Sequence, residues 1–275
     1  MQANSIAVIG GGNMARSLAG GLVADGVPAS QLTVAEPEPA RRKVLERELG
    51  VATTPDNARA AAAADVVVLA VKPQVMPGVA RELAGSLAGR PVLVISVAAG
   101  IRTTDLARWL GDGPAVIRAM PNTPALLGCG ATVLFAAPQV SESQREQAEA
   151  ILRAVGSVSW VEDEHQLDAV TALSGSGPAY FFLLSEAMAE AAAELGLDPA
   201  LAELLAVETA LGAARMAIES EEDVAELRRR VTSPGGTTEA ALEALEAGGF
   251  RRLVVQALAS AQERSRTLAE RFGKE

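Results

Sequence analysis

The sequence is poor in the residues that build disulfides, metal sites and aromatic cores. Among its 275 residues are one cysteine, Cys129, and one histidine, His165, and aromatic residues make up 3%. A single cysteine excludes a disulfide within the chain, and the same scarcity excludes a metal site with several histidine or cysteine ligands. No cluster of carboxylates at ligand spacing replaces such a site. We expect a core of alanine, valine and leucine, and a solvent-facing His165 near a helix start.

Positive charge is also in short supply. The formal net charge is -10 and the sequence pI is about 4.8, which makes nucleic acid an unfavourable partner. The longest apolar stretches, such as residues 66–71, are far shorter than the ~18 residues that indicate a membrane span. The first residues lack the basic segment and apolar stretch of a secretory signal. We therefore expect a cytoplasmic protein that does not associate with membranes.

Residues 1–161 alternate short apolar runs with helical patterns. Continuous valine, isoleucine and leucine runs are typical of parallel strands that are covered on both faces. Their alternation with helices predicts an α/β fold with a doubly wound, mainly parallel sheet. The predicted strands are residues 5–10, 32–36, 65–71, 91–97, 114–120, 131–137 and 157–162, and the predicted helices are 12–26, 37–49, 74–89, 102–111 and 142–155.

Residues 162–275 contain no convincing strand. Long helical patterns cover residues 176–196, 198–220 and 250–273, and the first two are apolar around much of their circumference. A helix that is apolar on most faces must be buried on most faces. This segment is too short to supply that cover without a central helix or a second subunit. We therefore predict a homodimer formed through this half of the chain.

A glycine-rich turn follows the first predicted strand directly. Residues 10–15 (GGGNMA) match the pattern G-x-G-x-x-A, in which Gly10 permits a tight turn and Gly12 allows a pyrophosphate to approach the backbone. Ala15 is small enough for the helix to pack on the strand, and the helix start offers free amides to an anion. The pattern predicts a dinucleotide site; the alternative is a glycine-rich turn needed only for packing.

The end of the second predicted strand bears on which dinucleotide is bound. Glu36 stands there, and an acidic residue at this place usually binds the ribose hydroxyls and disfavours a 2′-phosphate. Arg41, Arg42 and Lys43 follow, however, and are able either to neutralise a phosphate or to form a solvated helix face. The residues therefore leave NAD and NADP open.

Two later strand ends carry further signals. Lys72 and Pro73 follow the third predicted strand, at the edge where ligands bind in such sheets. Ala98, Ala99 and Gly100 follow the next strand, and such small residues allow a flat ring to lie against the backbone. The alternative for Lys72 and Pro73 is helix initiation beside an exposed lysine.

Two segments are unusual for a helical domain. Residues 173–180 read LSGSGPAY, and residues 231–245 read VTSPGGTTEAALEAL. The amides at the start of the second helix suit a carboxylate. The alternative is a helix cap by Thr237. For the first segment, the alternative is a break between helices with Pro178 in the first turn.

These strings together resemble the pyrroline-5-carboxylate reductase family over essentially the whole chain. The matches are IGGGNMA, VKPQ, VAAG, RAMPNTP (118–124), LSGSGPAYFF and VTSPGGTTEA, in the family's order and spacing. The resemblance implies a Rossmann domain at 1–161 and an all-helical dimerisation and substrate domain at 162–275. It also implies homodimers through intertwined helices, further assembly into decamers, and a substrate site at the dimer interface.

The resemblance also implies roles for individual residues. Together with Glu36, which the strand-end argument supplies, NADP or NAD is expected on Gly10, Gly12, Asn13, Met14, Asn57, Val71, Lys72, Pro73, Ala98 and Ala99. The substrate is expected on Glu164, Ser233, Gly236, Thr237 and Thr238. Of these, Ser233, Gly236 and Thr237 are expected to hold its carboxylate and Thr238 its imine nitrogen. Family members commonly have a serine near the end of the second strand, where this chain has Ala35, Glu36 and Pro37.

The implied reaction is hydride transfer from NAD(P)H to the imine carbon of 1-pyrroline-5-carboxylate, which gives L-proline in the last step of proline biosynthesis. A protonated imine is already electrophilic, so we assign Thr238 the role of an orienting donor or a relay from water. A 3-hydroxyacid or 6-phosphogluconate-type dehydrogenase would need a lysine or histidine base, yet the residues after 165 contain only Lys274. A nonenzymatic NAD(P)-binding sensor is the other alternative.

Overall fold

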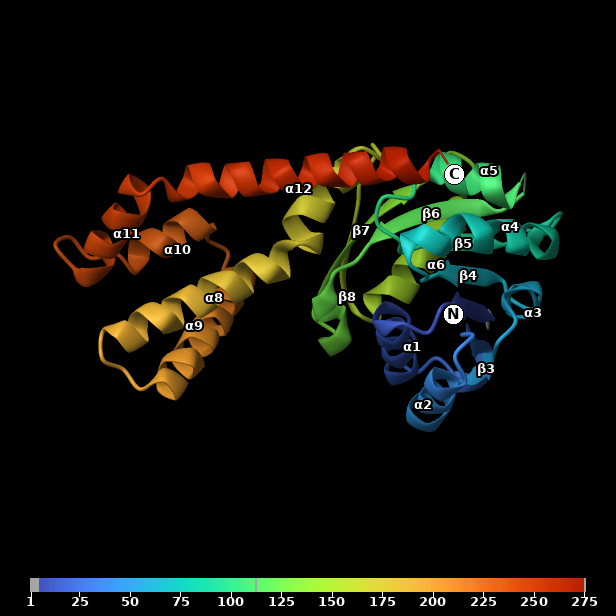
Figure 1. Cartoon of the computed structure of the whole chain (residues 1–275), viewed down its shortest axis with the longest axis horizontal. Coiled ribbons are helices and arrows are strands. Elements are labelled where there is room, and N and C mark those ends of the chain that lie inside the picture. Colours follow the sequence, from blue (N-terminus) through green and yellow to red (C-terminus); the bar gives the residue numbers. More distant parts are fainter. Residues whose placement is uncertain (1–4, 112, 275) are drawn as a thin grey trace. The chain divides into compact units, whose positions relative to one another are not determined.

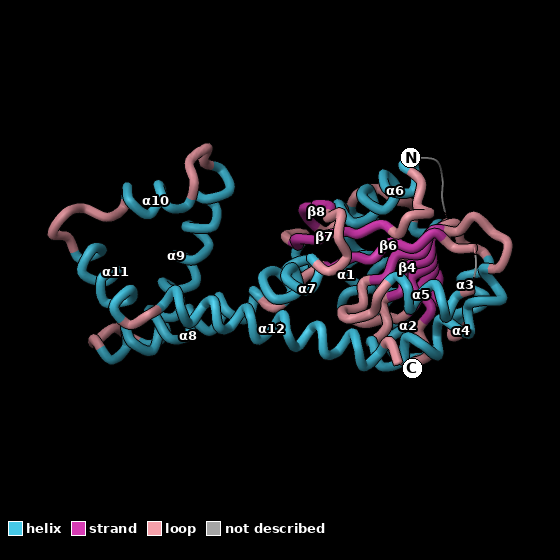
Figure 2. The backbone as a smooth tube through the Cα atoms, turned by 90° about the horizontal axis from the view of Figure 1, so that it is seen from above, coloured by secondary structure: helices cyan, strands magenta, loops and turns pink. Residues whose placement is uncertain are grey.

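The computed structural model describes residues 5–111 and 113–274. Contacts divide the chain into two compact units, Met1–Gly175 with Ala261–Glu275, and Ser176–Ser260. The first unit contains the sheet and the second is helical, as the ribbon and the tube show (Figures 1 and 2). The predicted fold class is confirmed. The boundaries of these units differ from those of the predicted domains, 1–161 and 162–275. Residues 162–175 and the end of the last helix belong to the sheet-containing unit.

An eight-stranded sheet, as far as the described residues show, organises the first unit. Its order is β3-β2-β1-β4-β5-β6-β7-β8, and each neighbouring pair is parallel except β6 with β7. The strands are β1 (Ile6–Ile9), β2 (Leu32–Ala35), β3 (Ala52–Thr54), β4 (Val66–Leu69), β5 (Leu93–Ser96), β6 (Ala115–Met120), β7 (Gly130–Ala136) and β8 (Gly156–Trp160). The seven predicted strands are all present. The short edge strand β3 was missed, because three residues of sequence ATT carry no strand pattern of their own.

Helices cover both faces of this sheet. Ile6 and Val8 join the core beneath α1 (Asn13–Ala24), α2 (Pro39–Leu49) and α6 (Glu142–Arg153). Ala7 and Ile9 join the opposite core beneath α3 (Asn57–Ala62), α4 (Met76–Leu87) and α5 (Thr103–Leu110). Short helical turns complete the unit: η1 (Ala29–Gln31), η2 (Pro73–Val75), η3 (Thr123–Leu127), α7 (Gln166–Val170) and the π-helical η4 (Thr171–Gly175). The cores consist mainly of alanine, valine and leucine, as expected, and His165 is exposed at the start of α7.

The end of the last helix, α12 (Phe250–Phe272), is anchored on the sheet-containing unit. Ser265 donates a hydrogen bond of 2.7 Å from its hydroxyl to Oδ1 of Asp168, and both residues are buried. Arg108 donates to the carbonyl oxygen of Gly273 at 2.7 Å, and Phe272 lies in the core. Buried polar groups are costly unless they are paired, so this hydrogen bond fixes one position of the helix end.

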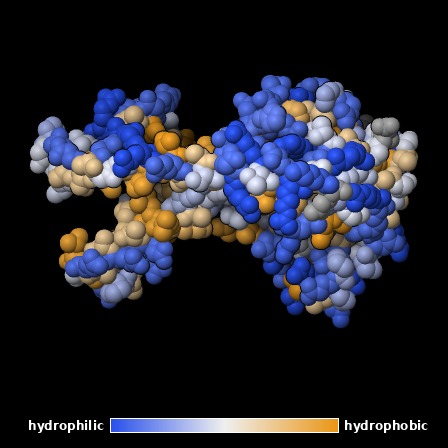
Figure 3. All heavy atoms as spheres, turned by 45° about the horizontal axis from the view of Figure 1, so that its top comes forward, coloured by the Kyte–Doolittle hydropathy of each residue, from blue (hydrophilic) through white to orange (hydrophobic). Residues whose placement is uncertain are grey.

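The helical unit leaves most of its apolar side chains uncovered. It comprises α8 (Gly177–Glu194), α9 (Pro199–Glu219), α10 (Val224–Arg230), α11 (Thr237–Ala247) and the start of α12. Its buried apolar side chains are the small ones of Ala202 and Ala206, whereas Phe182 on α8 is 71% exposed. Figure 3 shows apolar surface on this unit. Exposed large side chains include Phe181, Leu183, Leu204, Val207, Met216, Leu253 and Val255.

Apolar patches of this extent mark an interaction surface. The expected second subunit would supply the missing cover. No helix among the described residues combines the length and apolar character that crossing a membrane requires.

We predict that Phe182→Glu weakens self-association, because a carboxylate would then lie where an aromatic ring is buried against the second copy. The dimer dissociation constant should rise roughly tenfold or more, the size of effect found for aromatic anchors. Light scattering after size exclusion over a concentration series measures it. Leu127→Glu, at a leucine of the sheet-containing unit that is 84% exposed, is the matched control. A wild-type protein that elutes only as a monomer at micromolar concentration would refute this picture.

Candidate functional site

The glycine-rich turn has the geometry that anion binding requires. Gly10 follows β1 with φ +102°, and a Cβ atom added there would lie 2.8 Å from the carbonyl oxygen of Ala70. Gly12 is the N-cap of α1, which has no side-chain cap, and the space beside its Cα is open. Ala15 is fully buried against the sheet. The turn therefore presents the start of a helix to a ligand, with room for close approach.

A groove of about 460 Å³ runs along this turn. Gly11, Gly12 and Asn13 form one side of it, and the cationic side chains that line it are Arg16, Arg41 and Lys72. Cations beside the amides of a helix start suit the phosphates of a dinucleotide. The groove thus brings together residues that lie 60 positions apart in the sequence.

The other predicted coenzyme residues lie at the same edge of the sheet. Ile9 is the register partner of both Ala35 and Leu69, and Leu69 is the partner of Ser96, so the strands end level with one another. The residues that follow these ends are Gly10 after β1, Glu36 after β2, Val71, Lys72 and Pro73 after β4, and Ala98 and Ala99 after β5. Parallel α/β sheets bind ligands outside the carboxyl ends of their strands.

Asn57 follows β3, the strand that the sequence pattern did not predict, and therefore lies at the same edge of the sheet. It opens α3, which follows β3, and its Nδ2 donates to Oε2 of Glu82 at 3.1 Å. Asp56 caps the helix by accepting from the Arg59 amide at 2.9 Å.

Glu36 is bound to the glycine-rich turn itself. Its Oε2 accepts from the Gly11 amide at 2.8 Å, and its Oε1 accepts from the Glu38 amide at 2.9 Å. The residue is 5% exposed. Arg42 donates to the carbonyl oxygens of Glu36 and Pro37, at 2.7 and 2.8 Å. The carboxylate is therefore fixed at the end of β2.

The RAMPNTP and LSGSGPAY strings meet through Asn122. Its Nδ2 donates to the backbone oxygen and the hydroxyl of Ser174, at 3.3 and 3.2 Å, and its Oδ1 accepts from the Ala131 amide at 2.9 Å. Ser174 lies in the π-helical η4, and π-helical turns are frequent at functional sites. A Cβ atom on Gly175 would overlap the Met120 side chain. These contacts join the two strings within the sheet-containing unit.

Glu164 is held by three donors of the sheet-containing unit. Its Oε1 accepts from the Thr103 amide at 2.8 Å and from Nη1 of Arg118 at 3.2 Å, and its Oε2 accepts from the Thr103 hydroxyl at 2.8 Å. Arg118 is 3% exposed, and its Nη2 has no partner among the described residues. Arg118 opens the RAMPNTP string, but the sequence assigned no role to it or to Thr103, because their pairing with Glu164 exists only in the folded chain.

The predicted substrate turn lies in the helical unit. Gly236 is the N-cap of α11, which has no side-chain cap, so the expected alternative of a cap by Thr237 is not seen. Gly235 has φ +69°, and its amide donates to Oε2 of Glu239 at 2.7 Å. Thr237 and Thr238 are the first two residues of the helix. Ser233, Gly236, Thr237 and Thr238 are thus neighbours around one helix start.

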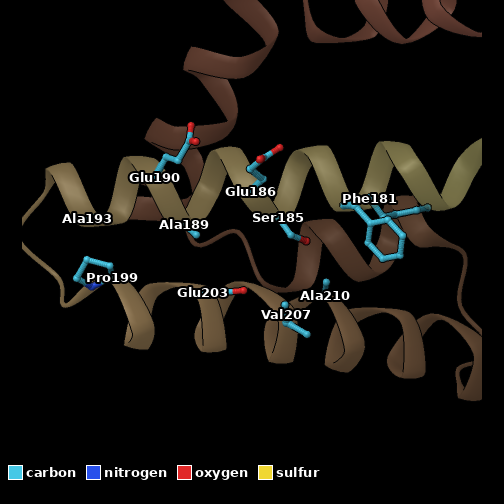
Figure 4. Close-up of a pocket in the computed structure, with 11 residues that line it drawn as sticks. Phe181, Ser185, Glu186, Ala189, Glu190, Ala193, Pro199, Glu203, Val207 and Ala210 are labelled. Carbon is cyan, nitrogen blue, oxygen red and sulfur yellow. The ribbon is translucent and has the colours of Figure 1, made fainter.

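A separate groove of about 690 Å³ lies between α8 and α9. Phe181 and Ser185 point from α8 toward α9, whereas Glu186 and Glu190 point away from it (Figure 4). None of the predicted site residues lines this groove. We therefore assign it to the exposed apolar surface of the helical unit rather than to the reaction site.

Comparisons with known proteins identify relatives along the whole chain. Residues 164–268 match a family model described as pyrroline-5-carboxylate reductase dimerisation, and residues 5–100 match one described as NADP oxidoreductase coenzyme F420-dependent. A pyrroline-5-carboxylate reductase of Pseudomonas aeruginosa is 53% identical over 274 residues, covering 100% of both chains.

Two solved structures share the fold throughout. A pyrroline-5-carboxylate reductase from Coxiella burnetii has a TM-score of 0.94 at 48% identity and covers 98% of this chain and 99% of its own. A pyrroline carboxylate reductase from Plasmodium falciparum, solved with NADP bound, has a TM-score of 0.86 at 27% identity, with the same coverage of 98% and 99%.

We predict that Gly10→Ala abolishes most dinucleotide binding and destabilises the chain, because a methyl group must displace the Ala70 carbonyl. Gly26→Ala is the matched control, since Gly26 has φ +92° with no atom near its Cβ position. The control should lose only the roughly 1–2 kcal/mol of a positive φ in a residue with a side chain. Urea unfolding and a fluorescence titration with the coenzyme separate the two effects. Equal losses in both variants would contradict the close approach at Gly10.

Proposed function

The chain belongs to the pyrroline-5-carboxylate reductase family, and we propose that its two helix starts, at α1 and α11, divide the ligands of the reaction between them. The protein is an NAD(P)-dependent oxidoreductase that reduces the imine of 1-pyrroline-5-carboxylate to proline. The dehydrogenase and sensor alternatives are not favoured. The observation that carries the proposal is the uncapped start of α11 directly after the SPGG turn.

The coenzyme residues fit a dinucleotide. The uncapped amides of α1, the open side of Gly12 and the groove cations Arg16, Arg41 and Lys72 match a pyrophosphate. Glu36 and Asn57 would hold the adenosine, and residues 71–73 with Ala98 and Ala99 would border the nicotinamide. When bound, the reduced coenzyme supplies the hydride. The chain itself binds and orients it, and the small side chains after β5 leave room for a flat ring.

The substrate carboxylate would lie at the start of α11. Ser233, Gly236 and Thr237 surround that start, where backbone N–H groups and the helix dipole favour an anion. The Gly235 amide donates to Oε2 of Glu239, and this bond helps to hold the turn in shape. A carboxylate placed there fixes one end of the five-membered ring, and this positioning supplies much of the rate.

Thr238 would orient the imine nitrogen. Its hydroxyl is too weak an acid to protonate an imine outright, so it acts as a hydrogen-bonding partner or passes a proton from water. The iminium form is already electrophilic at its carbon, so positioning suffices. Glu164 would border the substrate, with its carboxylate oriented by Thr103 and Arg118.

The dimerisation family supports self-association of this chain. We propose that the helices of residues 162–275 form the dimer and that dimers assemble further into decamers. The exposed apolar side chains of α8 and α9 support the first part. The domain ranges 1–161 and 162–275 and the cytoplasmic location stay predictions from the sequence.

We predict that the purified protein oxidises NADH or NADPH in the presence of 1-pyrroline-5-carboxylate and forms proline in equal amount. The fall in coenzyme absorbance measures the oxidation of NAD(P)H, and amino-acid analysis measures the proline that is formed. 6-Phosphogluconate and a 3-hydroxyacid, supplied with NAD(P)+, should give no turnover. Coenzyme binding without turnover on any cyclic imine would instead favour the sensor.

We further predict that Thr238→Ala lowers kcat by roughly tenfold to a hundredfold, as loss of an oriented donor in a reaction site does. NAD(P)H affinity should change little, because Thr238 is not part of the coenzyme groove. Thr238→Ser should recover most of kcat, since it restores the hydroxyl. Steady-state kinetics and coenzyme titration separate these quantities. An unchanged kcat in Thr238→Ala removes this residue from the chemistry.

A further inference from the structure

The Glu36 carboxylate is a negative charge at the end of β2, and it is hydrogen-bonded to Gly11, which lines the coenzyme groove. Its two oxygens accept from the Gly11 and Glu38 amides at 2.8 and 2.9 Å, and the residue is 5% exposed. A carboxylate has about four lone-pair positions, so two backbone bonds leave capacity for two further donors. The bound carboxylate is therefore able to accept hydrogen bonds from a sugar but has none to donate.

Backbone contacts hold Glu36 beside the glycine-rich turn. The Glu36 amide donates to the Thr54 carbonyl oxygen at 2.9 Å, which ties the residue to β3. A Cβ atom on Gly11 would lie 2.9 Å from three atoms of the Glu36 side chain, so the turn packs directly against it. A bulky anion that binds at the end of β2 would therefore lie close to the carboxylate as it is placed in this structure.

The arginines that follow β2 have hydrogen-bond or ion-pair partners within the protein. Arg42 donates to the carbonyl oxygens of Glu36 and Pro37, so its guanidinium stabilises the turn after the strand. Arg41 forms an ion pair of 2.9 Å with Glu38. Both arginines that follow β2 therefore already bond to oxygen atoms of the protein.

From this geometry, we propose that Glu36 makes the adenosine end of the groove select NADH over NADPH. The ribose hydroxyls of NADH donate to the free lone pairs of the carboxylate, as acidic residues at this strand end do. The 2′-phosphate of NADPH carries about two negative charges and would face a buried carboxylate that is held by two backbone amides. The inference rests on the proposed function, in which NAD(P)H is the hydride donor.

The kinetic test compares kcat/KM for NADH and NADPH in three proteins. Wild type should favour NADH by about tenfold or more, since opposed like charges are strongly unfavourable. Glu36→Ser should raise the ratio of kcat/KM for NADPH to kcat/KM for NADH by about tenfold or more for the same reason. This expectation holds even if both kcat/KM values fall. Glu46→Gln, which removes one exposed charge from α2 outside the groove, should leave the ratio unchanged. A wild type that prefers NADPH, or a ratio that Glu36→Ser does not move, overturns the proposal.

A second measurement needs no variant and no turnover. Competition against NADH binding with 5′-AMP and with 2′,5′-ADP compares two ligands that differ only in the 2′-phosphate. We expect 5′-AMP to compete more strongly, and equal or stronger competition by 2′,5′-ADP would refute the role of Glu36. Failure of the reductase proposal would appear separately, as coenzyme binding without imine reduction.

Discussion

The level ending of β2, β1, β4 and β5 is the constraint on which the site depends. These strands pair in parallel with Ala35, Ile9, Leu69 and Ser96 in register. Any residue that follows one of these strand ends is thereby brought to a single edge of the sheet. The glycine-rich turn, Glu36, Lys72 and Ala98 lie at one edge of the sheet for this reason, and each loop is free to supply different chemistry.

The helical unit obeys a different constraint, which is the shortage of its own core. Its helices carry phenylalanine, leucine and valine, yet the residues it buries are mainly small, such as Ala202 and Ala206. Burying apolar area is the main favourable contribution to folding, so a unit with so much exposed apolar surface is incomplete as a monomer. A dimerisation family that spans residues 164–268 agrees with this reading. The proposed substrate turn lies in the same segment.

Several site residues serve two purposes at once. Glu36 accepts a hydrogen bond from the glycine-rich turn and is also a proposed adenosine residue. Asn122 joins β7 to the π-helical turn around Ser174. Glu164 joins Thr103 to the buried Arg118. The contacts of these residues stabilise the fold, and their motifs or sequence positions also suggest a role in the site.

The sequence by itself determined the order of strands and helices, the glycine-rich turn and the uncovered apolar helices, because each is a local pattern of side-chain size and polarity. It did not determine β3, whose three residues become a strand only by pairing with β2. Nor did it determine that Arg118 pairs with Glu164, or Asp168 with Ser265, since these partners are 46 and 97 positions apart. Contacts over such separations follow from how the layers pack, which only the tertiary structure decided.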